Sequence, residues 1–279
     1  MEKTADKPLK NLLREHGVVL KKAYGQNFLT DENLLNEIAE KAGVTKETTV
    51  LEIGCGAGAL TRVLAAKAKK VVGYEIDKTL IPVLKETLAE FDNTEIVNKD
   101  VMKVGVKEIE DKLGGKYVIV ANLPYYITTP IVMNFLENAK NLQAMSIMVQ
   151  EEVALRFAAA AGTSDYGAIT VGINLRGSAE IVLRVPREKF TPVPNVDSAV
   201  VKITMEEGKF DGADMKKVRD VVRAAFSSRR KMLVNNLMNF YRLSRAEAEN
   251  ALLTAGIDLT ARGEKLSAEE FVRLAEILG

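Results

Sequence analysis

The sequence predicts an α/β protein with a mostly parallel sheet, followed by a small all-helical domain. Between about residues 30 and 150, short apolar runs alternate with helical stretches, and such alternation is typical of parallel strands covered by helices. After residue 205 the chain shows helical patterns only, and capping boxes at Ser244 and Ser267 mark two helix starts. A length of 279 residues is enough for one large domain and one small one.

Five apolar runs are predicted to form the parallel strands, with helices between them. The strands are expected at 49–53, 70–75, 95–98, 117–121 and 144–149, and the helices near 31–42, 59–68, 78–90 and 130–139. Two later segments, 167–175 and 180–185, are separated by a short turn and predict an antiparallel pair. One more strand is expected at 197–205.

A polar segment with two glycines, residues 206–214, separates the two halves of the chain. We therefore expect a first domain at 1–205 and a second, helical domain at 206–279. Gly256 is placed to end a helix of the second domain, because glycine readily adopts the left-handed conformation that follows many helices.

Single residue types exclude several functional classes. Cys55 is the only cysteine, so the chain cannot form an internal disulfide and a zinc cluster is not expected. His16 is the only histidine, which removes His-based triads and leaves Cys55 without an activating base. The polar start of the chain does not resemble a signal peptide, and no apolar run is as long as a membrane span. We expect a metal-free cytoplasmic protein that acts as a monomer.

Positive charge is concentrated in the C-terminal part of the chain. Residues 216–245 contain nine Lys and Arg residues and one acidic residue, which gives this segment a charge of +8, whereas the whole chain carries +1. A solvated helix face explains part of this bias, but clustering on this scale favours a polyanionic partner. The candidate contact residues are Arg223, Arg229, Arg230 and Lys231.

The segment 51–61 runs from a predicted strand through three glycines into a predicted helix. The glycines are Gly54, Gly56 and Gly58, and they permit a sharp bend and a close approach of the backbone to a ligand. Glu75 ends the next strand, where a carboxylate can bind both hydroxyls of a ribose. The same loop also satisfies the dinucleotide pattern G-x-G-x-x-A, so the loop alone does not distinguish NAD from S-adenosylmethionine.

Three further features favour S-adenosylmethionine over NAD. Glu52 precedes the loop, and an acidic residue there suits a ligand that presents an amine rather than a pyrophosphate. Asp100 follows the third strand, where a carboxylate can accept a hydrogen bond from an adenine amine. The motif 122–125, Asn-Leu-Pro-Tyr, ends the fourth strand at the carboxyl edge of the sheet. With a parallel sheet closed by an antiparallel hairpin, these features predict a Rossmann-like class I methyltransferase.

The motif 122–125 suits the transfer of a methyl group to an exocyclic amine. Such an amine is a poor nucleophile, because its lone pair is delocalised into the base. The Asn122 side-chain oxygen can accept one amine hydrogen, and a backbone carbonyl beside Pro124 can accept another. The Tyr125 ring can stack on the base and fix the plane of approach. We predict direct transfer, with no covalent enzyme intermediate and no metal.

Several segments, in order, resemble the KsgA-type family of rRNA adenine N6,N6-dimethyltransferases. They are 25–29 (GQNFL), the loop 52–61, Glu75, Asp100, the motif 122–125, 190–198 (FTPVPNVDS) and 228–236 (SRRKMLVNN). The resemblance covers almost the full chain and is more specific for the superfamily than for one RNA target. Tyr126, a second tyrosine directly after the motif, is a modest departure.

The resemblance implies a cofactor site for S-adenosylmethionine. Its expected residues are Gln26, Asn27 and Leu29 as a cover, Gly54, Gly56 and Gly58 near the methionine part, Glu75 at the ribose and Asp100 at the adenine amine. It also implies a site for the target base. There, Asn122 would bind the target amine, with the carbonyl of Leu123 or Pro124 as the second acceptor.

Two aromatic residues complete the expected base site. The resemblance implies that Tyr125 and Phe190 sandwich the target base between their rings. The simpler structural alternatives are that Phe190 anchors a loop in the core and that Tyr125 is a buried wall residue. The motif favours the base-binding interpretation for both residues.

The resemblance implies N6,N6-dimethylation of two adjacent adenosines in small-subunit rRNA, within a pre-assembled subunit that is held through the basic C-terminal segment. Three alternatives stay open. The first is an Erm-type enzyme for large-subunit rRNA, although such enzymes tend to carry Ile where this chain has Leu123. The second is a non-catalytic ribosome-assembly factor. The third is an NAD-dependent oxidoreductase, disfavoured because no hydride-transfer constellation is evident.

Overall fold

The computed structural model describes residues 13–18 and 27–278 and divides the chain into two compact units. The first unit consists of Met1–Ala154 with Glu180–Met205, and the second of Leu155–Ala179 with Glu206–Gly279. The first domain expected from the sequence, 1–205, included residues 155–179. In the structure that segment belongs to the second unit.

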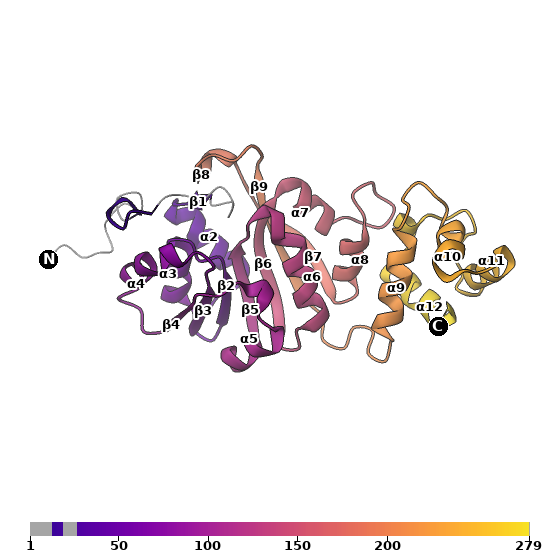
Figure 1. Ribbon diagram of the computed structural model, residues 1–279, viewed down its shortest axis with the longest axis horizontal. Helices are drawn as coiled ribbons and strands as arrows, with labels where there is room; N and C mark the ends of the chain where they lie inside the picture. The colour runs from indigo at the N-terminus through magenta and orange to yellow at the C-terminus, as the bar shows by residue number, and fades with distance from the viewer. Residues whose placement is uncertain (1–12, 19–26, 279) are drawn as a thin grey trace. The chain divides into compact units, whose positions relative to one another are not determined.

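The first unit is built on a seven-stranded sheet in the order β4-β3-β2-β5-β6-β9-β7 (Figure 1). Along the chain the strands are β2 (Thr49–Ile53), β3 (Lys70–Tyr74), β4 (Thr94–Val97), β5 (Tyr117–Asn122), β6 (Leu142–Gln150), β7 (Gly177–Val185) and β9 (Ser198–Met205). The pairs from β4 to β6 are parallel, and β9 is antiparallel to β6. This sheet confirms the predicted fold class, and its first five strands lie where the apolar runs predicted them.

Helices cover the sheet and make its central strands apolar on both sides. Helices α2 (Glu32–Ala42) and α3 (Ala59–Lys67) share a core with Val50 of β2. Successive strand residues point to opposite faces, and Leu51 is also fully buried, so the other face is covered too. Helix α5 (Val106–Leu113) contacts β2 and also α6 (Thr128–Asn138). Burial on both faces explains why these strands read as continuous apolar runs.

A two-stranded sheet connects two distant parts of the first unit. Strand β1 (Phe28–Leu29) pairs antiparallel with β8 (Phe190–Thr191), and the two lie side by side in Figure 1. Next to this sheet, Lys189 Nζ lies 2.7 Å from Asp31 Oδ2, and this contact lowers the pKa of Asp31 below its usual range. Two-residue strands carry no sequence pattern, so this pairing was not predicted.

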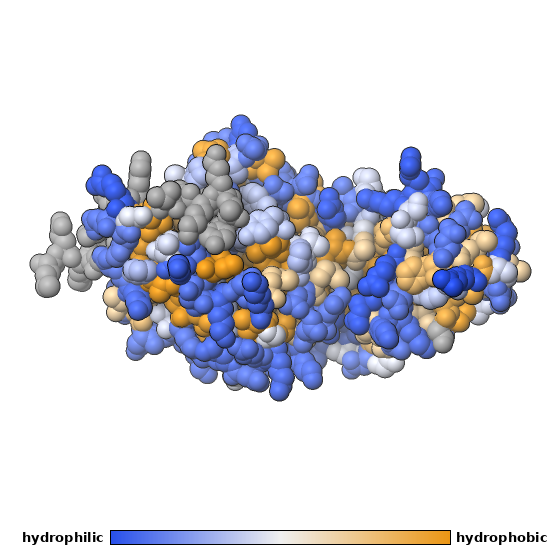
Figure 2. All heavy atoms as spheres, viewed as in Figure 1, coloured by the Kyte–Doolittle hydropathy of each residue, from blue (hydrophilic) through white to orange (hydrophobic). Residues whose placement is uncertain are grey.

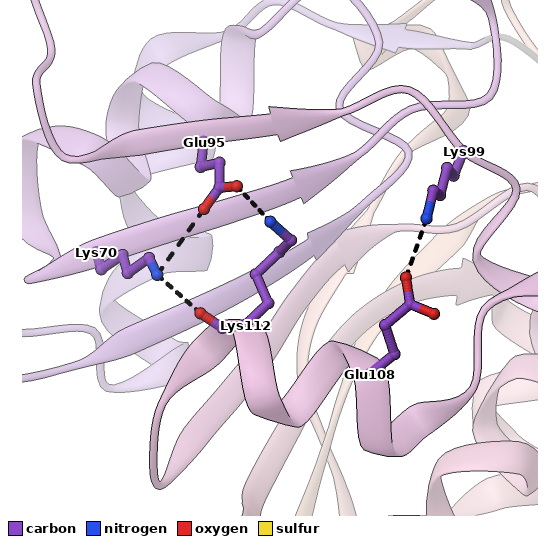
Figure 3. A network of polar contacts seen from close by, with 5 residues as sticks. All are labelled: Lys70, Glu95, Lys99, Glu108 and Lys112. Carbon is purple, nitrogen blue, oxygen red and sulfur yellow. Dashed lines mark hydrogen bonds and ion pairs between the residues drawn. The ribbon is translucent and has the colours of Figure 1, made fainter.

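An ion-pair network ties the edge of the large sheet to α5 (Figure 3). Glu95 on β4 forms ion pairs with Lys70 on β3 and with Lys112 on α5, and Lys70 Nζ donates to the Lys112 carbonyl oxygen at 2.8 Å. These side chains are partly exposed, so each pair contributes at most about 1 kcal/mol. The network covers the edge strand β4 and holds it against β3.

The second unit is helical and has its own core. Its helices are α8 (Ala168–Asn174), α9 (Met215–Ala225), α10 (Leu233–Tyr241), α11 (Arg245–Thr254) and α12 (Ala268–Leu278), while α7 (Glu151–Phe157) spans the unit boundary. The capping boxes predicted at Ser244 and Ser267 are both formed. Gly256 follows α11 with φ 73°, which confirms the predicted helix end. None of the helices in the described part of the chain has the length and apolarity of a membrane span.

The strand prediction at 167–175 is wrong, because most of this segment forms helix α8. Its β-branched apolar residues favour a strand locally, but Val171 and Leu175 pack into the core of the second unit. The helix start is fixed by Thr170, whose hydroxyl accepts from the Gly167 backbone N–H and donates to the Arg156 carbonyl. The pattern was therefore overridden by tertiary packing. Strand β7 instead begins at Gly177 and lies next to β9.

Candidate functional site

A cavity of about 330 Å³ opens at the carboxyl ends of the parallel strands in the first unit. The predicted site residues that line it are Asn27, Leu29, Gly54, Gly56, Glu75, Asp100, Asn122, Leu123, Pro124 and Tyr125. Gly58 and Phe190 are not among its lining residues, and Gln26 lies outside the described residues. A cavity of this size suits a small molecule.

The glycine loop between β2 and α3 forms one wall of the cavity. Gly56 has φ 58°, and a Cβ at this position would lie 3.0 Å from Cε1 of Phe28, so a side chain would press into the cover of the cavity. Gly58 serves the fold instead. Its φ is 90°, and a Cβ there would lie 3.0 Å from Cγ2 of Thr87 on the neighbouring helix α4 (Ile81–Thr87).

Glu75 ties the glycine loop to the end of β3. Its Oε2 accepts from the Gly56 backbone N–H at 2.8 Å, and its Oε1 accepts from the Asp77 backbone N–H at 2.8 Å. Burial raises the pKa of Glu75, although these two hydrogen bonds oppose the shift. Each carboxylate oxygen keeps a further lone pair, so Glu75 can still accept hydrogen bonds from ligand hydroxyls.

Glu52 is the most unusual charged residue of the cavity wall. It is 1% exposed, and within the described part of the chain its Oε2 has no hydrogen-bond partner. Burial raises the pKa of Glu52 to about 8, and the charge of nearby Glu75 adds to this effect, while Thr61 opposes it. An unpaired buried carboxyl favours its neutral form unless a cation approaches.

The charges around the cavity suit a cationic ligand better than a pyrophosphate. Glu52, Glu75 and Asp100 contribute three carboxyl groups, whereas Lys99 is the one Lys or Arg among the described lining residues. The Lys99 ammonium lies 2.9 Å from Glu108 Oε1, as Figure 3 shows. A dinucleotide would bring two negative charges toward this wall, so the geometry disfavours the NAD alternative.

Asn122, at the end of β5, is oriented by a contact that the sequence did not indicate. Its Nδ2 donates to the backbone carbonyl oxygen of Asn27 at 3.2 Å. A carbonyl only accepts hydrogen bonds, so the amide nitrogen must face Asn27 and Oδ1 must face away from that carbonyl. An amide oxygen that is left in this way is a candidate acceptor for an amine.

The two candidate carbonyls of the motif differ in their availability. The Pro124 carbonyl oxygen accepts from the Ile127 backbone N–H at 3.1 Å and from Thr128 Oγ1 at 3.2 Å. A carbonyl oxygen has two lone pairs, and both are used at Pro124. The Leu123 carbonyl is the better candidate for the second acceptor of the target amine.

The Tyr125 side chain is held by a hydrogen bond, whereas the Tyr126 side chain is largely exposed. The Tyr125 hydroxyl lies 2.8 Å from Oγ of Ser198, which is fully buried at the start of β9. Tyr126 is 60% exposed, so it is not a core residue. Ser198 and Thr128 were not assigned roles from the sequence, because their importance depends on contacts between distant segments.

Phe190 lies in the core of the first unit. It is 1% exposed, it pairs with Leu29 across the small sheet, and it packs in the core that α2 and α3 share. In this arrangement its ring is not brought to the cavity beside Tyr125. This position matches the alternative in which Phe190 anchors a loop.

Replacing Phe190 with alanine is expected to lower the thermal midpoint of the protein and to reduce methyl transfer as a consequence. Removing a buried aromatic ring costs about 3–5 kcal/mol. Thermal unfolding and cofactor titration together check this expectation. A normal midpoint and normal cofactor affinity, with methyl transfer lost, would instead support the base-binding role of Phe190.

Cys55 and His16 both have structural surroundings. Burial raises the pKa of the Cys55 thiol well above its usual range, and a Cβ on Gly73 would collide with its sulfur. Cys55 is buried and packs against Leu84 and Leu88. His16 Nε2 lies 2.8 Å from Glu86 Oε2 and contacts the surface of α4.

The four candidate RNA-contact residues of the second unit differ in the contacts that they make within the protein. The Arg229 guanidinium donates to the carbonyl oxygens of Ser164 and Tyr166 at 2.7 and 2.9 Å, so it braces a loop of its own unit. Arg223 forms an exposed ion pair with Asp220 at 3.4 Å. Arg230 and Lys231 are exposed.

Comparisons with known proteins cover nearly the whole chain. The sequence model of a family described as ribosomal RNA adenine dimethylase matches residues 18–279. The chain is 45% identical over 276 residues to the ribosomal RNA small subunit methyltransferase A of Bacillus pumilus (strain SAFR-032), covering 96% of this chain and 94% of that protein. The protein of the same name from Clostridioides difficile (strain 630) is 44% identical over 272 residues, with the same coverage.

Two solved structures share the fold over most of their length. A dimethyladenosine transferase from Plasmodium falciparum has a TM-score of 0.76 at 26% identity, covering 88% of this chain and 95% of that one. The 23S rRNA methyltransferase ErmE has a TM-score of 0.69 at 32% identity, covering 90% of this chain and 99% of that one. Both likenesses extend beyond the first unit into the helical second unit, because neither unit alone accounts for such coverage.

Proposed function

The chain belongs to the ribosomal RNA adenine dimethylase family, and from this premise we propose that it transfers methyl groups from S-adenosylmethionine to N6 of adenosines in small-subunit rRNA. The curated relatives at 44–45% identity carry a small-subunit name, whereas the ErmE structure, named for 23S rRNA, is 32% identical. This difference favours the small-subunit target over the Erm-type alternative. The proposed product is N6,N6-dimethyladenosine at two adjacent positions.

The orientation of Asn122 is the observation that carries this proposal. Its amide nitrogen is held by Asn27, which leaves Oδ1 as an acceptor beside a cavity lined by carboxyl groups. An acceptor fixed in this way selects an amine as the reacting group. A non-catalytic assembly factor would not need this side chain to be held in one orientation.

The cavity residues fit S-adenosylmethionine, which would supply an activated methyl group on a sulfonium. Glu52 would face the cationic amino-acid end, Glu75 the ribose hydroxyls and Asp100 the adenine amine. Asn27, Leu29 and Gly56 would lie along the ligand. The unpaired Glu52 oxygen and the three carboxyl groups of the wall are the features that support this cofactor.

Direct transfer requires positioning more than acid–base chemistry. Asn122 Oδ1 and the Leu123 carbonyl would accept the two hydrogens of the target amine and direct its lone pair toward the methyl group. As N6 becomes tetrahedral and positive, the same two oxygens stabilise the developing charge. Neither oxygen is a strong base, so the proton leaves N6 to water after the transfer.

We also propose that the substrate is a partly assembled small subunit and that the protein acts on it as a cytoplasmic monomer. A base in a helix must leave its stack before N6 is accessible, at a cost of a few kcal/mol. Stacking on an aromatic ring returns about 1–3 kcal/mol per base, and Tyr125, which lines the cavity, would provide it. A particle that presents the base unpaired would lower the remaining cost.

Transfer of tritium-labelled methyl groups to small subunits purified without this modification tests the proposed function. Large subunits and DNA are the controls, and the product is digested to nucleosides. Label in N6,N6-dimethyladenosine from small subunits alone is expected. Label only in large-subunit RNA would favour the Erm-type alternative, and no label despite cofactor binding would favour an assembly factor.

Replacing Arg230 and Lys231 with alanine is expected to weaken RNA binding and to flatten its salt dependence. Each lost phosphate contact lowers the slope of log K against log salt by about 0.9 for duplex and about 0.7 for single strands. Filter binding of small-subunit RNA at several salt concentrations measures this slope. Arg229 is examined separately, since its loss also removes the brace to Ser164 and Tyr166. An unchanged slope in the double variant would place the RNA on another surface.

A further inference from the structure

A hydrogen bond links the motif 122–125 to the start of strand β9. The Tyr125 hydroxyl and Ser198 Oγ lie 2.8 Å apart, and either group can be the donor. Burial raises the pKa of Tyr125, so its phenol keeps its proton at neutral pH and can always take part in this contact. The two residues are far apart in sequence, and the contact forms only when β5 and β9 lie on either side of β6.

The position of Ser198 is fixed by burial and by strand pairing. It is fully buried, and as the first residue of β9 it pairs with Gln150 at the end of β6. The preceding residue, Asp197, accepts a hydrogen bond through its carbonyl from the Glu151 backbone N–H at 3.0 Å. The Ser198 hydroxyl is therefore carried by a backbone that the sheet fixes, and it can hold the Tyr125 side chain in place.

The Tyr125 backbone is fixed from the other side, so its ring is the part that needs a restraint. The carbonyl of Pro124 is held by Ile127 and Thr128, and Asn122 is the last residue of β5. The ring is half-buried and lines the cavity. With the backbone held, rotation about the Cα–Cβ bond would carry the ring away from its place. A hydrogen bond at the distal hydroxyl restrains that rotation.

We propose that Ser198 is a positioning residue that holds the Tyr125 side chain in one rotamer, so that its ring stays beside the cavity for stacking on the target base. This inference rests on the proposed function, because it assumes that Tyr125 meets a base. Stacking requires the ring to lie over the base at the moment of transfer, and a side chain without this contact samples other rotamers. Ser198 thereby acts on the reaction through Tyr125 and does not touch the substrate or the cofactor.

A double-mutant cycle with Ser198→Ala and Tyr125→Phe tests the proposal. Each variant removes one hydroxyl and keeps the rest of the side chain. Ser146→Ala is a matched control, because Ser146 is also a buried serine of the same sheet, its hydroxyl has no partner within the described residues, and it does not line the cavity. The readouts are the single-turnover rate on unmodified small subunits, the Kd for S-adenosylmethionine and the thermal midpoint.

Ser198→Ala and Tyr125→Phe are each expected to slow transfer by about tenfold, the upper range for one neutral hydrogen bond. The Kd for S-adenosylmethionine should stay within about twofold of the wild-type value, because no group of the carboxyl wall changes. The double variant should be no slower than either single variant, and Ser146→Ala should transfer at the wild-type rate. A wild-type rate in Ser198→Ala, or losses that multiply in the double variant, would overturn the proposal.

Separate measurements distinguish a failure of the proposed function from a failure of the positioning role. Absence of transfer by the wild-type protein would remove the proposed function. The ring position can still be read from a crystal structure of Ser198→Ala, in which the Tyr125 side chain is expected to adopt another rotamer or to occupy more than one. A ring that stays in place in that structure would overturn the positioning role by itself.

Discussion

Replacing Asn122 with alanine is expected to reduce the rate of methyl transfer by about 10²- to 10³-fold, the usual loss when one pre-organised hydrogen-bonding group is removed from a reacting centre. In the structure, Asn27 holds the Asn122 amide nitrogen, and Oδ1 is left to orient the target amine. Alanine removes this acceptor and leaves one carbonyl to hold two amine hydrogens. Single-turnover transfer to unmodified small subunits measures the loss.

Cofactor binding separates a lost acceptor from a damaged site. The Kd for S-adenosylmethionine should change little, because the glycine loop and the carboxyl groups of the cavity are untouched. Asn138→Ala is the matched control, since Asn138 is exposed at the end of α6 and, among the described residues, its amide nitrogen donates to two oxygens of Asn134. Near-normal turnover in Asn122→Ala would remove the proposed role, and an equal loss of cofactor affinity would assign Asn122 to the cofactor site.

The sequence predicted those parts of the fold that are repeated along the chain and buried on both faces. Strand β2 matches its predicted range of 49–53, because Val50, Leu51 and Ile53 of this central parallel strand are apolar and buried. Helix α2 was recognisable because Asp31 caps it and its apolar residues recur with a helical period. Such signals are local in the sequence, so they can be recognised without knowledge of the fold.

The predictions that differ from the structure depend on contacts between distant segments. Residues 168–174 contain β-branched residues typical of a strand, but the core of the second unit selects a helix. Phe190 belongs to a motif that suggests a base contact, yet the two-residue pairing with Leu29 places its ring in the core. Arg229 was chosen for its charge, and its guanidinium is used by two carbonyls of its own unit. Charge, motif and periodicity do not identify contact partners that are distant in the sequence.

Sequence reasoning brought several residues of the cavity wall together but not the contacts that support them. Glu75, Asp100 and Asn122 line one cavity because the ends of parallel strands meet at one edge of a sheet, and their binding roles stay predictions. The contacts that orient them were not found, because the Asn27 carbonyl is a backbone group and leaves no trace in residue type. The Ser198 hydroxyl was visible in a motif but had no assigned partner.

Replacing Glu52 with glutamine is expected to stabilise the ligand-free protein at pH 8 by a few kcal/mol and to change little at pH 5. The unfolded chain releases the Glu52 proton near the ordinary value of 4.5, whereas the folded protein holds it up to about pH 8. Between these values the folded state binds more protons than the unfolded state, so the free energy of unfolding falls as the pH rises. The loss is at most about 1.4 kcal/mol for each pH unit, and glutamine does not ionise.

Thermal unfolding of the two proteins between pH 5 and pH 8 measures this difference. Glu137→Gln is the matched control, because it makes the same substitution at an exposed position on α6. Equal pH dependence in wild type and Glu52→Gln would show that Glu52 ionises in the folded protein at its ordinary pH. Its unpaired oxygen would then be solvated through the cavity.

Cofactor binding adds a second consequence to the same buried carboxyl. A cationic ligand favours the ionised form of Glu52, so binding at pH 7 is expected to release a proton and to tighten as the pH rises toward 8. Calorimetry of S-adenosylmethionine binding in buffers of different ionisation enthalpy counts that proton. The ligand's own amine titrates with both proteins, so the difference between wild type and Glu52→Gln isolates Glu52. A ligand that binds equally to both proteins, without a difference in proton release, would mean that Glu52 stays neutral and supports the glycine loop by packing alone.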